Sequence, residues 1–256
     1  MRISISDIND YIKCPLYYKL KNIDELPMDK SVDDYFKEYF KLALYFYYFS
    51  VIEKNKKSFE LMMRRWEELW FSDEMFDIFP EATLKEKSNE AVPLMTYFFK
   101  RYDVEKVIPI AVNFKYETIF QGKENLHITG EIDLIKVIND GTRKRESQLI
   151  FFNMSNRYPD NFFVKADVST AIASHAFREG FKEKEEKIVI QNVRLEEDID
   201  IARSGADHIR AEKIVRNICK GIKEGVFYPS PNNISCSNCS FKLFCLNEKS
   251  IPRGKD

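Results

Sequence analysis

The segment Leu126-His127-Ile128-Thr129-Gly130-Glu131-Ile132-Asp133-Leu134-Ile135-Lys136-Val137 alternates apolar and polar residues along most of its length. Such alternation predicts a strand with one buried face. A second alternating segment, residues 108–120, precedes it, and turn-forming residues 121–125 lie between the two. We therefore expect residues 108–120 and 126–137 to pair as a β-hairpin.

The segments that follow the hairpin predict a mixed α/β core. Residues 148–154 form a nearly unbroken apolar run, which is typical of a central strand buried on both faces. We expect a helix over residues 162–177, a strand over 187–193 and a long helix over 199–221. Strands and helices therefore alternate after the hairpin.

The residues before the hairpin are predicted to be helical, over 33–49, 59–70 and 88–102. The first of these helices carries a run of aromatic residues, namely Tyr35, Phe36, Tyr39, Phe40, Tyr45, Phe46, Tyr47, Tyr48 and Phe49. Aromatic rings can stack on nucleic-acid bases. Packing in a core is the more ordinary use of such a stripe, and we expect that use here.

Composition limits the classes of protein that need to be considered. A chain of 256 residues with 44% hydrophobic residues can bury a large core, either as one domain or as a core with an insertion. Its 40 basic and 41 acidic residues leave a net charge of -1, so any nucleic-acid surface has to be a local patch. We expect no membrane-spanning segment and no secretory signal, which favours the reducing cytoplasm.

Four of the five cysteines lie near the chain ends, Cys14 alone and Cys236, Cys239 and Cys245 as C-x2-C-x5-C. Four thiolates form a soft ligand set that fits zinc or a 4Fe-4S cluster. A metal bound there would act as a clasp that closes a very long loop. The alternative is a set of buried free thiols, which is the role we expect for Cys219.

The residues around these cysteines resemble a known family. Residues 4–18 predict a short serine-capped helix that ends near Pro15 and places Cys14 at its C-terminus. Residues 225–245 set the other three thiols among polar turn residues. Together they resemble the iron-sulfur branch of the RecB-like nucleases of the PD-(D/E)xK superfamily, which includes the CRISPR-associated RecB-type exonuclease and the AddB nuclease domain.

This resemblance implies a restriction-endonuclease-like α/β core with a helical insertion, and an iron-sulfur clasp that joins the N- and C-terminal segments. The clasp would be a 4Fe-4S cluster, with zinc as the alternative. The expected parts are a cluster-binding helix over residues 1–30, a helical lobe over 31–106, a nuclease-like core over 107–228 and a cysteine loop over 229–256.

The resemblance also implies an active site, of which only part is present. Gly130-Glu131-Ile132-Asp133 matches the G-x-x-D strand of the family, so Asp133 takes the position of a metal-binding aspartate. The D-x-K of the next strand is replaced by Asn153-Met154-Ser155. An amide and a hydroxyl lack the charges of aspartate and lysine, so we expect Mg²⁺ or Mn²⁺ to bind poorly.

Other carboxylates could replace the lost one. Glu117 lies on the strand before Asp133, and Glu146 lies at the start of the central strand. Glu146 precedes Asn153 by seven residues, about 23 Å along a strand, which is too far to share a metal. Asp160 and Asp167 lie near a helix start, where capping is the simpler role.

Five basic residues are candidate phosphate contacts: Arg143, Lys144 and Arg145 in the turn before the central strand, and Arg157 and Lys165 after it. Each could supply charge-assisted hydrogen bonds to phosphate. An ordinary solvated surface is the alternative, because the whole chain is nearly neutral.

The sequence therefore predicts a cytoplasmic, catalytically inactive RecB-like iron-sulfur protein. It would bind DNA or another nucleic acid, or scaffold a helicase, integrase or effector complex. Two alternatives stay open, an active Mg²⁺- or Mn²⁺-dependent DNA exonuclease with relocated catalytic residues, and a protein-interaction subunit that does not bind DNA.

Overall fold

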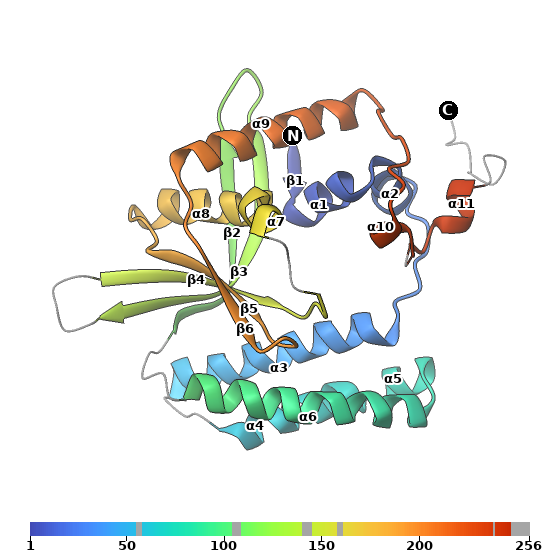
Figure 1. The fold of residues 1–256 in the computed structure, drawn as a ribbon, viewed down its shortest axis with the longest axis vertical. Helices are drawn as coiled ribbons and strands as arrows, with labels where there is room; N and C mark the ends of the chain where they lie inside the picture. Colours follow the sequence, from blue (N-terminus) through green and yellow to red (C-terminus); the bar gives the residue numbers. More distant parts are fainter. Residues whose placement is uncertain (55–57, 104–108, 140–144, 158–160, 238, 247–256) are drawn as a thin grey trace. The chain divides into compact units, whose positions relative to one another are not determined.

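The computed structural model describes the chain except for residues 55–57, 104–108, 140–144, 158–160, 238 and 247–256 (Figure 1). The chain forms two compact units. The first comprises Met1–Asp29, Tyr116–Gly130 and Ser204–Asp256, and the second comprises Lys30–Lys115 and Glu131–Arg203. The four cysteines of the predicted clasp therefore belong to the first unit, and Asp133 belongs to the second.

The first unit combines both chain ends with the tip of the hairpin. Its elements are β1 (Arg2–Ser4), α1 (Ile5–Lys13), α2 (Pro15–Tyr18), the π-helix η1 (Lys19–Ile23), α9 (Gly205–Lys223), α10 (Asn233–Ser237) and α11 (Lys242–Leu246), with parts of β2 (Pro109–Phe120) and β3 (Leu126–Asn139). Strand β1 runs parallel to β3. Ser4 and Asp7 form a reciprocal capping box at the start of α1, and Cys14 ends that helix. The predicted place of this thiol is confirmed.

The second unit holds the central strands and most of the helices. Its further elements are α3 (Val32–Lys54), α4 (Phe59–Trp70), α5 (Asp73–Ile78), α6 (Glu81–Asp103), β4 (Arg145–Asn153), α7 (Asn161–Ala166), α8 (Val168–Phe181), β5 (Lys187–Asn192) and β6 (Glu197–Ile201). The described strands follow the order β1-β3-β4-β5-β6, and β2 pairs with β3. Strand β4 is antiparallel to β3 and parallel to β5, so it is central as predicted. The fold is mixed α/β with a mixed sheet.

The aromatic run of α3 packs in the core, as the sequence predicted. Helices α3, α4 and α6 lie together in the second unit (Figure 1). Phe36 and Phe40 are fully buried, and the ring of Phe36 meets Trp66 edge-on with centroids 5.3 Å apart. Leu134 and Ile150 of the sheet belong to the same apolar cluster. Each large side chain buried in this way contributes about 2 kcal/mol or more to folding.

The predicted boundaries were wrong in several places. The helix expected after the central strand is two helices, because the Asp167 carboxylate accepts the N–H of Thr170 and caps α8. The start of the last predicted helix is instead strand β6, whose apolar and acidic residues alternate, and α9 begins only after Ser204. The helix expected from residue 88 begins at Glu81. None of the helices in the described part of the chain is long and apolar enough to cross a membrane.

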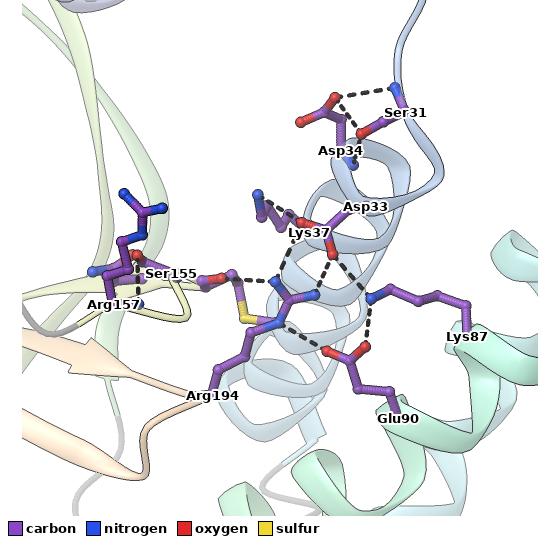
Figure 2. Close-up of polar contacts among 11 residues, drawn as sticks. Ser31, Asp33, Asp34, Lys37, Lys87, Glu90, Ser155, Arg157 and Arg194 are labelled. Carbon is purple, nitrogen blue, oxygen red and sulfur yellow. Dashed lines mark hydrogen bonds and ion pairs between the residues drawn. The ribbon is translucent and has the colours of Figure 1, made fainter. Parts of the chain in front are cut away.

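A buried arginine fixes the backbone just after β4. The side chain of Arg194 is 4% exposed. Its guanidinium pairs with Asp33 at the start of α3 (Nη2 to Oδ1, 2.6 Å) and with Glu90 of α6 (Nε to Oε1, 2.9 Å). It also donates to the carbonyl of Met154 at 3.1 Å (Figure 2). Two helices and the end of the central strand are thereby joined through one side chain.

Asp33 accepts hydrogen bonds from three cationic side chains in this network. Lys37 and Lys87 approach its carboxylate at 2.8 and 3.0 Å, in addition to Arg194 (Figure 2). Partial burial pushes the pKa of Asp33 upward, but the hydrogen bonds from the three cations outweigh it. The pKa of Asp33 therefore lies well below its ordinary value, and the carboxylate stays ionised in mild acid.

We predict that Asp33→Asn lowers the free energy of unfolding at neutral pH by about 1 kcal/mol, a small value because the side chain is 34% exposed. The depressed pKa contributes stability that is present above the unfolded pKa of about 4 and is lost as pH falls toward the folded value. Urea titrations at several pH values below about 4 should thus show that the free energy of unfolding falls more steeply with falling pH in the wild type than in Asp33→Asn. The control is Asp77→Asn on α5. The prediction would be contradicted if the free energy of unfolding depended on acid pH equally in the wild type, Asp33→Asn and this control.

Candidate functional site

The carboxylate of Asp133 is enclosed by hydrogen-bond donors from the second unit. The residue lies in β3 and is 2% exposed. Nζ of Lys41 lies 2.7 Å from its Oδ1, and the hydroxyl of Tyr45 donates a short hydrogen bond to the same oxygen. The backbone N–H of Phe152 donates to Oδ2 at 2.6 Å. Both carboxylate oxygens are therefore occupied by groups of the protein.

Lys41 is the counterion of this buried carboxylate. It lies one turn before Tyr45 on α3, so both side chains reach Asp133 from one helix face. Burial lowers the pKa of Lys41, but the charges of Asp133 and Glu131 outweigh it and hold that pKa above its ordinary value. Burial and the charge of Asp133 raise the pKa of Tyr45 far above its ordinary value, so the phenol stays protonated and remains a donor.

The pKa of Asp133 itself lies above its ordinary value, because the effect of burial outweighs the opposite effects of Lys41, Tyr45 and the N–H of Phe152. A carboxylate removed from water requires hydrogen bonds and a counterion to remain in place. These three donors provide both. Asp133 thus has its hydrogen-bond donors and its counterion without an added cation.

The side chains of Asn153 and Ser155 are used in local turns. Oδ1 of Asn153 accepts the backbone N–H of Ser155 at 2.9 Å. Oγ of Ser155 accepts the backbone N–H of Arg157 at 3.1 Å (Figure 2). Side chains of this kind commonly stabilise the chain as it leaves a strand.

This set of residues does not fit Mg²⁺ or Mn²⁺. Such ions require several oxygen ligands in regular geometry, and carboxylates are the protein groups that bind them best. Of the three positions considered, only Asp133 carries a carboxylate, and Lys41 already lies beside it. Asn153 and Ser155 offer neutral oxygens that accept backbone hydrogen bonds.

The carboxylates considered as replacements lie elsewhere. Glu117 belongs to the first unit, where it pairs with Arg2 at 3.1 Å and with Nδ1 of His127 at 2.8 Å. Glu146 lies opposite Ile138 in the ladder between β3 and β4. Because Ile138 is five residues beyond Asp133, the separation along the strand is about 16 Å. Glu146 is too distant to share an ion with Asp133.

The candidate phosphate contacts are only partly described. Arg143 and Lys144 lie outside the described residues, as does Asp160, and the side chain of Arg145 is not described either. Arg157 and Lys165 are both exposed. A nucleic-acid contact through the turn before β4 therefore stays a prediction.

The four cysteines of the predicted clasp line a single cavity in the first unit. Cys14, Cys236, Cys239 and Cys245 surround a space of 170 Å³, together with apolar residues that include Leu16, Leu20 and Phe241. Burial and the three other thiols raise the pKa of Cys245. Among the side chains that the structure describes, no three of histidine, cysteine, aspartate or glutamate lie close enough to hold an ion.

Backbone N–H groups donate to two of these sulfur atoms. The N–H of Ser230 lies 3.4 Å from Sγ of Cys14, and the N–H of Asn232 lies 3.3 Å from Sγ of Cys236. Hydrogen bonds to thiolate sulfur are a common feature of iron-sulfur sites, where they adjust the reduction potential. Cys219 is 2% exposed in α9 and does not line this cavity, so its predicted role as a buried thiol is confirmed.

The two chain ends also meet through contacts that involve no thiol. The N–H of Leu16 donates to the carbonyl of Tyr228 at 3.1 Å. The rings of Tyr17 and Phe241 lie 5.4 Å apart. The cavity therefore lies where the protein itself holds the N-terminal helices against the C-terminal segment.

The sequence did not identify Lys41 and Tyr45 as partners of Asp133. Tyr45 precedes Asp133 by 88 positions, so no local pattern connects them. One signal was present, because Lys41 is the last charged residue before an uncharged stretch that extends to Glu53. A cation at the edge of so apolar a helix needs a partner.

Comparison with known proteins shows a family model that matches nearly the full chain. The family model described as the PD-(D/E)XK nuclease superfamily matches residues 2–246. The chain is also similar to a solved structure titled "Crystal structure of SSO0001", with 14% identity, a TM-score of 0.40, and coverage of 83% of this chain and 94% of that chain. No curated protein matches. The matched range contains Asp133 and all four cysteines of the cavity.

We predict that Lys41→Met lowers the free energy of unfolding by about 3 kcal/mol, because Asp133 would be left buried without a counterion. The double variant Lys41→Met/Asp133→Asn should recover part of this loss, since asparagine carries no charge and its one carbonyl oxygen still accepts from the N–H of Phe152, while its NH2 can donate to the hydroxyl of Tyr45. Urea denaturation followed by circular dichroism measures both. Lys85→Met, which removes the exposed partner of Glu81, is the control and should change little. A loss no larger than that of the control would contradict the prediction.

Proposed function

Because this chain belongs to the PD-(D/E)XK nuclease superfamily, we propose that it is a pseudonuclease, which binds nucleic acid without cutting it. The observation that carries the proposal is the saturated carboxylate of Asp133. Metal-dependent phosphodiester hydrolysis needs a divalent ion beside this position to activate water and stabilise the developing charge. Lys41 provides a fixed positive charge there, but an ammonium group has no coordination position at which water could bind and lose a proton.

Nucleic-acid binding is supported by the charges around the replaced motif. A nuclease site with several free carboxylates repels phosphate unless metal ions are bound. Here Lys41 pairs with both Asp133 and the half-exposed Glu131, and the other two positions are uncharged. Arg157, just after Ser155, and Lys165 on α7 add exposed positive charge in the same unit. A phosphate group can therefore approach this position although no metal ion offsets the negative charge of the carboxylates.

We further propose that Cys14, Cys236, Cys239 and Cys245 hold a 4Fe-4S cluster. Four thiolates are the usual ligands of such a cluster. A single zinc ion would require all four sulfur atoms at about 2.3 Å from one point. The cavity of 170 Å³ has room for a group of several atoms, and its apolar lining and N–H donors suit a cluster. When bound, the cluster would link the two chain ends through covalent metal–sulfur bonds.

We predict that purified, anaerobically prepared protein leaves labelled single-stranded and duplex DNA intact in Mg²⁺ or Mn²⁺. The reason is that Asn153 and Ser155 supply no carboxylate at the D-x-K positions, and that Lys41 already pairs with both Asp133 and Glu131. Asp133→Ala serves as the control for contaminating nucleases, because contaminants cut equally in both preparations. Metal-dependent cutting by the wild type that disappears in Asp133→Ala would refute the pseudonuclease and favour an active exonuclease.

We predict that the fresh protein is brown, contains iron and inorganic sulfide in equal amounts, and shows broad thiolate-to-iron absorbance in visible light. Replacing Cys14, Cys236, Cys239 or Cys245 by alanine should remove most of the iron. The matched control is Cys219→Ala, which alters a thiol outside the cavity and should retain it. A colourless wild type with one zinc per chain, or equal iron in all variants, would contradict the cluster.

A further inference from the structure

Helix α7 presents two adjacent aromatic side chains to solvent. Phe162 is 71% exposed and Phe163 is 69% exposed. Val164, the next residue, is 6% exposed and turns inward. These are the most exposed phenylalanines among the residues whose placement the structure describes. Large apolar side chains this open to water commonly mark a binding surface when they occur together.

The backbone that carries these rings is held firmly. Arg203 is 3% exposed, and its guanidinium donates to the carbonyl oxygens of Val164 at 2.8 Å and Lys165 at 2.6 Å. It also donates to Oγ1 of Thr170 at 2.6 Å, which connects α7 to the start of α8. The last carbonyls of a helix otherwise lack partners. A buried arginine therefore anchors this short helix while its two rings stay outside.

The two rings lie at nearly a right angle. Their centroids are 5.7 Å apart and their planes are inclined by 81°. An aromatic face accepts any of the bases by stacking, because every base has a π-face. In a duplex these faces are already covered by neighbouring base pairs, so stacking on a protein ring favours unpaired bases.

The charge beside the rings selects the kind of partner. Arg157 and Lys165 flank the phenylalanines in sequence, and both are exposed. The sequence has two acids in residues 155–170: Asp167, whose carboxylate caps α8, and Asp160, which lies outside the described residues. Exposed aromatic rings with positive charge on both sides suit a polyanion with flat apolar groups better than an apolar or basic peptide.

We infer that Phe162 and Phe163 form a stacking surface for the unpaired bases of single-stranded nucleic acid, with Arg157 and Lys165 as phosphate contacts. This inference rests on the nucleic-acid binding proposed above and names its substrate class. Phe162 follows Ser155 by seven residues, so a strand bound on α7 lies close in sequence to the replaced nuclease motif.

The test is a fluorescence anisotropy titration at low salt with labelled oligo-dT and with the same strand paired to oligo-dA. Phe162→Ala/Phe163→Ala should weaken binding of oligo-dT about tenfold or more. Binding of the duplex should change much less. Replacing both residues by tyrosine should preserve the affinity for oligo-dT, whereas replacing both by leucine should lose it, because leucine is apolar but has no π-face. Phe76→Ala on α5, which alters another exposed phenylalanine, is the control.

The salt dependence of binding distinguishes the contribution of the aromatic rings from that of the basic side chains. Arg157→Ala/Lys165→Ala should reduce the slope of log affinity against log salt by about 0.7 for each phosphate that the variant no longer neutralises. The phenylalanine variants should leave that slope unchanged. Circular dichroism establishes that each variant is folded before it is titrated.

The possible failures are distinct. A folded wild type that binds neither probe at low salt refutes nucleic-acid binding as a whole. A wild type that binds, with an alanine pair that binds oligo-dT equally well, overturns the stacking surface alone. The stacking surface is also overturned if the alanine pair loses equal affinity for oligo-dT and for the duplex, or if the leucine pair keeps full affinity for oligo-dT. Either result would indicate a general apolar contact such as a protein interface.

Discussion

The ion pair between Lys41 and the buried carboxylate of Asp133 joins α3 to the sheet of the second unit. A carboxylate that is 2% exposed cannot remain charged without partners, and its partners come from α3 and β4. The pair thus determines where α3 meets the sheet. The same helix carries the buried aromatic residues of the core and, at its start, Asp33 with its three cations. One electrostatic requirement therefore connects the helical lobe, the sheet and the end of β4.

The same pair gives a physical account of how a nuclease-like site can be converted to binding. In the superfamily, the aspartate position serves a metal ion, whose charge attracts phosphate and activates water. In this chain a lysine supplies the charge, while Asn153 and Ser155 form turns with their own backbone. We propose that positive charge is retained at this position and that the metal-ligand set is not. Under our proposal, attraction for a phosphate backbone persists after the chemistry is lost.

Much of the fold could be predicted because it depends on neighbours along the chain. The alternation in residues 126–137 predicted β3, the apolar run after it predicted the central strand, and Phe59–Trp70 was placed as observed. The errors occurred where a local pattern had a competing explanation. Residues 197–201 alternate as a strand but were joined to the helix that follows, and Asp167 divides what looked like one helix.

The sequence by itself determined the hairpin, the central strand, most of the helices, the identity of Asn153-Met154-Ser155 at the end of that strand, and the presence of four thiols near the chain ends. Each of these is a property of residue identity or of near neighbours. Only the tertiary structure decided that Lys41 neutralises Asp133, that the thiols line one cavity, and that Phe162 and Phe163 face solvent. The physical reason is that burial and charge pairing depend on residues far apart in the chain, and these meet only when the elements pack.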